Sequence, residues 1–129
     1  MDKIFYKNIL IGIHITSLPS GSSPLTDGAE PLQIVSLKHP KGAYLKAHAH
    51  EQRKRVTQGL QEALIVKSGS ASVDLYAKTE SGFQKFKTVD LKVGDVFILM
   101  NGGYGIHVTE DAEMIEVKNG PFVEDKILI

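Results

Sequence analysis

The 129-residue chain contains no cysteine. This absence excludes disulfide bonds, thiolate zinc sites and a cysteine nucleophile, so packing alone must supply the stability of the fold. Net charge is absent as well, because fifteen Lys and Arg balance fifteen Asp and Glu. A balanced chain offers no long-range attraction to nucleic acid or to an anionic membrane, and recognition of an anion must be local. We therefore expect a small-molecule ligand, and neither nucleic acid nor a membrane as partner.

The chain also lacks a long apolar run. The apolar stretch near the N-terminus, residues 9–15, is interrupted by Gly12 and His14. It is too short to span a bilayer and is followed by no small-residue cleavage site, so it predicts a strand rather than a signal peptide. A cytoplasmic location is the default expectation. The glycine-rich phosphate loop, the nucleophile elbow and the zinc-finger pattern are missing too.

Helical periodicity is scarce, whereas short β-branched or alternating runs recur between Gly, Pro, Ser and Asn residues. This profile predicts an all-β domain, a sandwich or barrel, and the length fits a single domain over residues 1–129. Three of the five prolines lie in residues 17–31, which we expect to form an irregular loop or arm. The expected strands lie near residues 9–15, 32–38, 43–50, 61–67, 71–77, 83–91, 95–100, 104–109 and 112–118.

Two turns join expected strands into hairpins. The string KSGSAS, from Lys67 to Ser72, predicts a tight turn between two alternating segments. The string LYAKTESGFQKF predicts a second hairpin with Ser81-Gly82 at its tip. Before the first turn, alternation places Glu62 on the same face as the apolar Leu64 and Val66.

His48 and His50 are separated by one residue, so on a strand both side chains project the same way, with Cβ atoms roughly 6.5–7 Å apart. Two imidazoles at that spacing can converge on one cation. Glu62 adds a carboxylate directed into an apolar interior, where a metal ion or a cationic partner offsets the cost of burial. The alternatives are two idle histidines at the rim of a strand, and a Glu62 that is the exposed end of a strand buried from Leu64 onward.

These residues carry a family resemblance. Gly42, five residues, His48-Ala49-His50, then Glu62, six residues and Gly69 resembles the first motif of the cupin superfamily, G-x5-H-x-H-x(3–4)-E-x6-G. Eleven residues separate His50 from Glu62 in this chain, where the motif has three or four. An extended hairpin loop at the barrel mouth, residues 51–61, can house the surplus.

The second cupin motif is matched by GDVFILMNGGYGIHV only in part, since Met100 replaces its proline. The continuation YGIHVTEDAEMIEV aligns Tyr104 with the usual histidine ligand, and His107 is the other candidate. Strand parity places Tyr104 inward with its apolar neighbours and His107 outward. The glycines around position 103 also permit a bulge, which would exchange the two faces.

The resemblance implies a double-stranded β-helix (jelly-roll) barrel and a divalent metal ion, Fe, Mn, Ni or Zn. Its ligands would be His48, His50 and Glu62, with Tyr104 or His107 completing the shell. Residues 42–129 are similar to small single-domain cupins often associated with surface-polysaccharide or nucleotide-sugar pathways. We accordingly expect an oxygen-rich, anionic sugar-type substrate and rank isomerisation or epimerisation first and oxygenation second, with Tyr104 as the proton donor.

Arg53 and Arg55, in the run EQRKRVTQ, are either a solvated charged face or a clamp for the substrate's anionic group. Replacement of the usual histidine by Tyr104 keeps open a non-catalytic alternative, a cupin module that binds a sugar or other metabolite. Small cupins are often dimers, so we expect a homodimer. His14 and His39 have no partner that the sequence identifies.

Overall fold

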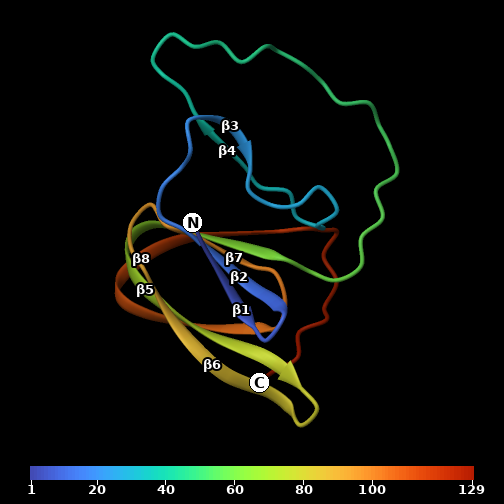
Figure 1. Ribbon diagram of the computed structural model, residues 1–129, viewed down its shortest axis with the longest axis vertical. Helices are drawn as coiled ribbons and strands as arrows, with labels where there is room; N and C mark the ends of the chain where they lie inside the picture. The colour runs from blue at the N-terminus through green and yellow to red at the C-terminus, as the bar shows by residue number, and fades with distance from the viewer. The chain divides into compact units, whose positions relative to one another are not determined.

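The computed structural model describes residues 1–129, and it contains eight β-strands and no helix (Figure 1). The prediction of an all-β chain is therefore confirmed. The chain divides into two compact units, which are described separately: Met1–Ser17 with Leu60–Ile129, and Leu18–Gly59. Nowhere does the fold provide a helix with the length and hydropathy needed to cross a membrane. The single domain over residues 1–129 and the mouth loop over residues 51–61 stay predictions.

The larger unit is one curled antiparallel sheet that forms a half-barrel (Figure 1). Its strands follow the order β1-β2-β7-β5-β6, and β8 pairs with the other edge of β5. The strands are β1 (Asp2–Tyr6), β2 (Ile9–Ile15), β5 (Glu62–Thr79), β6 (Gly82–Leu91), β7 (Val96–Leu99) and β8 (Gly103–Lys118).

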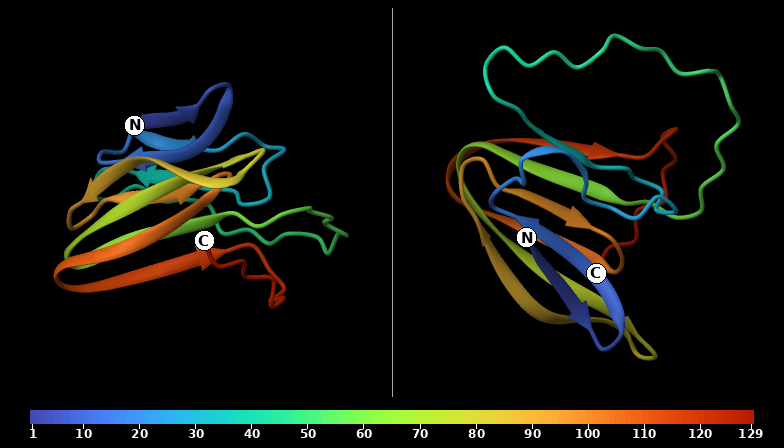
Figure 2. Two further views of the ribbon diagram at one scale, coloured as in Figure 1. Left: turned by 90° about the horizontal axis from the view of Figure 1, so that it is seen from below. Right: turned by 45° about the horizontal axis from the view of Figure 1, so that its top comes forward.

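The two longest strands, β5 and β8, curve together, as both views in Figure 2 show. The expected turn at Lys67 to Ser72 is wrong, because β5 continues through it as one bent strand. Gly69 makes the bend with φ 72°, and a Cβ at this position would collide with the backbone of Asp111 on β8. Register shifts on both sides of Gly69 show that the pairing with β8 persists across the bend. The strands expected at 104–109 and 112–118 are likewise one strand, β8.

The bend lets β5 line both halves of the core. Before it, Leu64 and Val66 are buried opposite β7, and after it Val73 and Leu75 are buried beside β6. Burial of each such side chain contributes about 1.5–3 kcal/mol to the fold. The core cluster consists of Ile4, Ile11, Leu64, Val66, Val73, Leu75, Ala77, Val89, Leu91, Phe97 and Leu99.

The remaining hairpins of this unit have tight turns. β5 and β6 form the hairpin that LYAKTESGFQKF predicts, and Thr79 closes its turn by donating its hydroxyl to Gly82 O at 2.7 Å. β1 was not expected. It pairs with β2 through a turn in which Lys7 has φ 54°, a left-handed conformation that is uncommon for a residue with a side chain.

The smaller unit contains one antiparallel pair, β3 (Gly21–Pro24) and β4 (Val35–Lys38). The region 17–31 is therefore irregular except for β3. Thr26 tightens the connection by donating to Leu32 O at 3.2 Å and accepting from Ile34 N at 3.0 Å. The strand expected at residues 43–50 is wrong, since this exposed segment has no regular secondary structure and takes part in no ladder. Alternating side chains do not make a strand unless its backbone finds a partner.

Candidate functional site

Four polar side chains share the inner face of the half-barrel. Glu62 begins β5, Tyr104 lies near the start of β8, and Glu116 and Lys118 lie near its end. The β5–β8 register places them together on the face that carries the core. The cross-strand pairs are Glu62 with Lys118, Leu64 with Glu116, and Leu75 with Tyr104.

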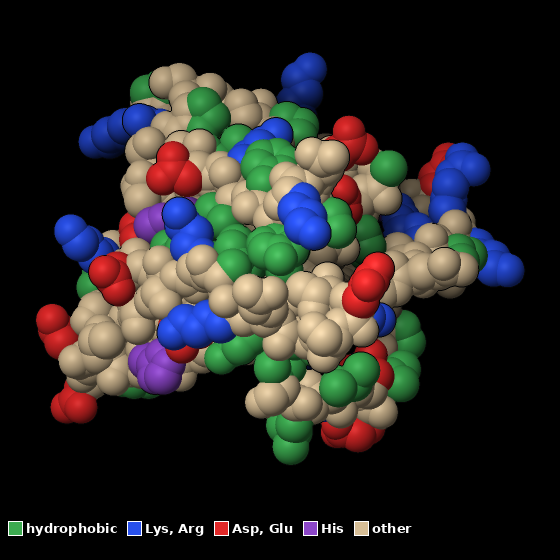
Figure 3. All heavy atoms as spheres, turned by 60° about the horizontal axis from the view of Figure 1, so that its bottom comes forward, with side chains coloured by type: hydrophobic (Ala, Val, Ile, Leu, Met, Phe, Trp, Pro, Cys, Tyr) green, Lys and Arg blue, Asp and Glu red, His purple; other side chains and the backbone are tan.

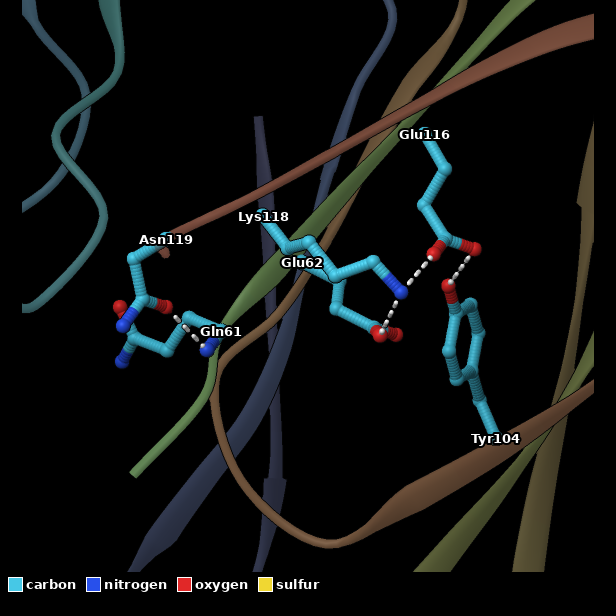
Figure 4. Close-up of polar contacts among 6 residues, drawn as sticks. All are labelled: Gln61, Glu62, Tyr104, Glu116, Lys118 and Asn119. Carbon is cyan, nitrogen blue, oxygen red and sulfur yellow. Dashed lines mark hydrogen bonds and ion pairs between the residues drawn. The ribbon is translucent and has the colours of Figure 1, made fainter. Parts of the chain in front are cut away.

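These four side chains form a continuous chain of contacts (Figure 4). The Lys118 ammonium lies between two carboxylates, with Nζ 2.8 Å from Glu116 Oε1 and 3.5 Å from Glu62 Oε1. Tyr104 donates its hydroxyl to Glu116 Oε2 at 3.1 Å. Two carboxylates therefore share one ammonium and one phenol.

Burial and charge set the protonation states of this chain. Burial of the Tyr104 ring, followed by the negative charges of Glu62 and Glu116, raises the pKa of the phenol above its usual range. The hydrogen bond from Lys118, with a second from Tyr104, lowers the pKa of Glu116. The hydrogen bond to Glu116, together with the negative charge of that carboxylate, raises the pKa of Lys118. Near neutral pH the site thus holds a neutral phenol, an ionised Glu116 and a cationic lysine.

Packing holds Tyr104 in place while its hydroxyl stays reachable. The ring packs against the core and stacks on Phe97, with centroids 6.5 Å apart and planes 25° apart. The side chains of Glu116 and Lys118 are 34% and 43% exposed, respectively, so solvent and small molecules reach their polar ends. A polar ligand on this face could meet a proton donor, a proton acceptor and a cation side by side.

A second contact fixes the strand ends that carry the site. Asn119, directly after β8, accepts at Oδ1 from the backbone N–H of Gln61, directly before β5, at 2.8 Å (Figure 4). Gln61 is buried, and its amide donates to Met100 O at 3.4 Å. These bonds keep Glu62 and Lys118 in register.

Glu62 points to the interior face, as alternation predicts, and its side chain is 14% exposed. Its cationic partner in the structure is Lys118, which sequence reasoning did not single out. Glu116 was missed as well. The alternation of Glu116 and Lys118 with Ile115 and Val117 could have indicated a shared face, but only the β5–β8 register shows which residues they meet.

His48 and His50 belong to the smaller unit, where their rings lie next to each other although the segment forms no strand. Their ring centroids are 5.2 Å apart with an edge-on angle of 76°. His48 Nδ1 bonds to Lys46 O at 2.9 Å, which leaves Nε2 and both nitrogens of His50 without a partner in the protein. The pair therefore has free nitrogen donors.

Arg53 and Arg55 lie in the exposed segment that follows this pair. Arg53 bonds to Glu51 Oε2 at 2.6 Å, and Arg55 donates to Arg53 O at 3.4 Å. Both contacts link near neighbours along the chain. A role of either guanidinium in substrate binding stays a prediction.

Tyr104 and His107 lie on opposite faces of β8. The inward side is occupied by Tyr104, as strand parity predicts. His107 instead bonds through Nε2 to Asp74 Oδ2 at 2.7 Å on the outer face. The structure thus brings Glu62 and Tyr104 together and places His107 apart from both.

No three His, Asp or Glu side chains gather in the structure in a way that could hold a metal ion. The metal ligands named above stay predictions. Comparisons of the chain with protein-family models, with curated proteins and with solved structures gave no match.

Proposed function

We propose that the inner face of the half-barrel binds a small, oxygen-rich sugar-type molecule and moves a proton between its neighbouring positions, as an isomerase or epimerase does. The observation that carries this proposal is the contact chain Tyr104–Glu116–Lys118–Glu62. It combines an acceptor, a donor and a cation within hydrogen-bonding reach of one another, which general acid–base catalysis requires.

In the proposed reaction, Glu116 accepts the proton from the carbon next to a substrate carbonyl. Tyr104 passes its hydroxyl proton to the carbonyl oxygen and takes up the proton that Glu116 has just received. The product is an enediol, and neither residue has gained or lost a proton overall. The reverse sequence at the neighbouring carbon completes the isomerisation, while the Lys118 ammonium stabilises negative charge on the reacting oxygen.

The test is hydrogen–deuterium exchange at carbon. Pentose phosphates, hexose phosphates and nucleoside diphosphate sugars are incubated with the protein in D₂O, and loss of carbon-bound protons is followed by ¹H NMR. We expect exchange with at least one keto or aldo sugar. The Glu116→Gln variant should lower its rate about 100-fold or more, since general acid–base groups typically contribute 10²–10⁴.

His107→Gln is the matched control, because it removes a titratable side chain from the same strand on the opposite face. It should leave exchange unchanged. Saturable binding on the inner face without exchange for any sugar would favour the non-catalytic module, and equal loss in both variants would contradict the assigned roles.

A divalent metal ion is a second candidate component, favoured by the free nitrogen donors of His48 and His50. Two imidazoles and the carboxylate of Glu62 suit Fe, Mn, Ni or Zn, the ions that the cupin resemblance implies. When bound, such an ion would polarise a substrate carbonyl.

Elemental analysis of untagged protein purified without chelator tests this component. About one ion per chain in the wild type and in His39→Ala, and none in the His48→Ala/His50→Ala double variant, is the expected result. A full equivalent in the double variant would exclude the two histidines as ligands.

A further inference from the structure

A groove of about 640 Å³ lies between β1 and β6, the two outermost strands in the β1-to-β6 order of the sheet. No hydrogen-bond ladder joins these strands, but Tyr6 and Phe86 meet with ring centroids 5.2 Å apart. The volume lies within the range of small-molecule sites. The groove is lined by Met1, Asp2, Lys3, Ile4, Phe5, His14, Phe86, Lys87, Thr88 and Val89.

The side of the molecule drawn in Figure 3 carries hydrophobic side chains near its centre, with charged side chains around them. The groove likewise combines apolar residues, such as Ile4 and Val89, with charged ones, such as Lys3 and Lys87. None of the four residues of the inner-face site lines this groove.

His14 enters the groove wall as half of a histidine–aspartate pair. Its Nε2 lies 2.9 Å from Asp95 Oδ2, and the two side chains are only 13% and 10% exposed. Asp95 lies in the turn before β7, where its Oδ2 also accepts from Lys92 N at 3.0 Å. Gly94 completes this turn with φ 88° and donates to Val66 O at 2.9 Å. The carboxylate therefore orients the imidazole from a rigid support.

The second ring nitrogen of His14, Nδ1, is available to bond to a ligand. Because the Asp95 carboxylate is an acceptor, Nε2 carries the hydrogen of their bond, and a neutral ring then has its lone pair on Nδ1. Nδ1 has no partner in the protein. Since no buried side-chain nitrogen or oxygen lacks a partner, Nδ1 must be accessible, and His14 borders the groove.

Two unpaired cations accompany this imidazole. Lys3 and Lys87 line the groove, and neither forms an ion pair within the chain. Asp2 is the single carboxylate among the lining residues. The local charge thus favours an anionic group, and the Nδ1 lone pair favours a ligand hydroxyl that can donate to it.

We infer that this groove is a second ligand site, for a phosphorylated hydroxy compound of sugar-phosphate size. Lys87 and Lys3 hold the phosphate as ammonium donors, and a hydroxyl of the ligand donates to His14 Nδ1. The apolar residues of the groove cover the carbon skeleton. The site is independent of the proposed proton-transfer chemistry on the inner face.

The experiment is a titration of ¹⁵N-labelled full-length protein with D-glucose 6-phosphate, read by long-range ¹H–¹⁵N spectra of the imidazoles and by backbone amide shifts. We expect saturable shifts at the His14 ring and at the amides of Lys87 and Lys3. Inorganic phosphate should bind more weakly because it lacks the skeleton and sugar hydroxyls, and D-glucose should not bind measurably.

Lys87→Gln should weaken binding about tenfold, as expected for loss of a hydrogen bond from a charged donor. Lys78→Gln, at the exposed tip of the β5–β6 hairpin, removes the same charge outside the groove and should bind like the wild type. Lys87 is itself exposed, so its replacement does not threaten folding.

Three results would overturn the inference: no saturable shift at His14, equal weakening by the Lys87 and Lys78 variants, or shifts confined to Tyr104 and Glu116. The last result would locate the ligand on the inner face and support the proposed function instead. Failure of carbon exchange together with saturation at His14 would leave the groove assigned and the proposed function without support.

Discussion

The two faces of β8 carry two different polar clusters. On the outer face, one carboxylate meets three donors: Asp74 accepts from Thr88 at 2.6 Å, from Lys85 at 2.8 Å and from His107 at 2.7 Å. On the inner face, two carboxylates share one ammonium and one phenol. Donors are in excess on one side of the strand, and acceptors on the other.

The two clusters differ in exposure and in how many donors each carboxylate already accepts from. The Asp74 side chain is 9% exposed, and its hydrogen bonds to Lys85, Thr88 and His107 hold its pKa well below the usual range. It has little capacity left for a ligand. Glu116 is 34% exposed and keeps acceptor capacity. Residue types are similar on both faces, so donor balance and exposure make the difference.

The largest effect is expected for a substitution at Gly69, which would disturb both clusters at once. Gly69→Ala places a Cβ against the backbone of Asp111 in a left-handed conformation, at the bend on which both faces depend. We expect a loss of about 3 kcal/mol in the free energy of unfolding, measured by urea denaturation. Gly105→Ala is the control, because its Cβ would meet nothing within 4 Å and its φ is not left-handed. Similar losses in both variants would contradict the close approach at Gly69.

The next effect concerns the inner face alone. Tyr104→Phe removes the hydroxyl that bonds to Glu116 and keeps the ring packed on Phe97. We expect carbon exchange in D₂O to slow about 100-fold. The free energy of unfolding should change by about 1 kcal/mol or less, the usual contribution of one hydrogen bond. Unchanged exchange in the folded variant would remove Tyr104 from the proposed reaction.

The pH dependence of the free energy of unfolding tests a carboxylate on each face, Asp74 on the outer and Glu116 on the inner. Asp74 and Glu116 both have a lowered pKa in the folded protein. The stability they contribute is present above the unfolded pKa, near 4, and is lost as the pH falls toward their folded values. Urea midpoints should therefore decline below about pH 4.

Two amide variants test this assignment. Asp74→Asn should lower stability at pH 7 and flatten the acid decline, and Glu116→Gln should flatten it less, because Glu116 is more exposed. A decline as steep in Asp74→Asn as in the wild type would show that Asp74 is not its main source.

The smallest effect is expected for His107→Gln, which removes one of the three donors to Asp74. Lys85 and Thr88 remain, and the His107 side chain is 65% exposed. We expect a loss below about 1 kcal/mol in the free energy of unfolding. A loss comparable with that of Gly69→Ala would mean that the outer cluster depends on this imidazole.

Much of the fold was predictable from local patterns. Alternation identified β2, β6 and β7 closely, and it placed Glu62 on the same face as Leu64 and Val66. The turn at Ser81-Gly82 was found because glycine there supplies the left-handed conformation that the hairpin needs.

The errors have a common physical cause. Gly69 resembles a turn glycine in sequence, yet a residue with positive φ also bends a continuous strand when a neighbour pairs across it. Residues 43–50 alternate like a strand but form no ladder. In both cases the outcome depends on whether a distant segment offers hydrogen bonds, which local sequence does not encode.

The sequence by itself determined the all-β class and the inward direction of Glu62 and Tyr104, because alternation and strand parity depend only on neighbouring residues. Only the tertiary structure decided that Glu62 meets Lys118, that Tyr104 donates to Glu116 and that His14 is held by Asp95. These contacts join residues from 12 to 81 positions apart. Strand register, set by the packing of the whole sheet, brings them together.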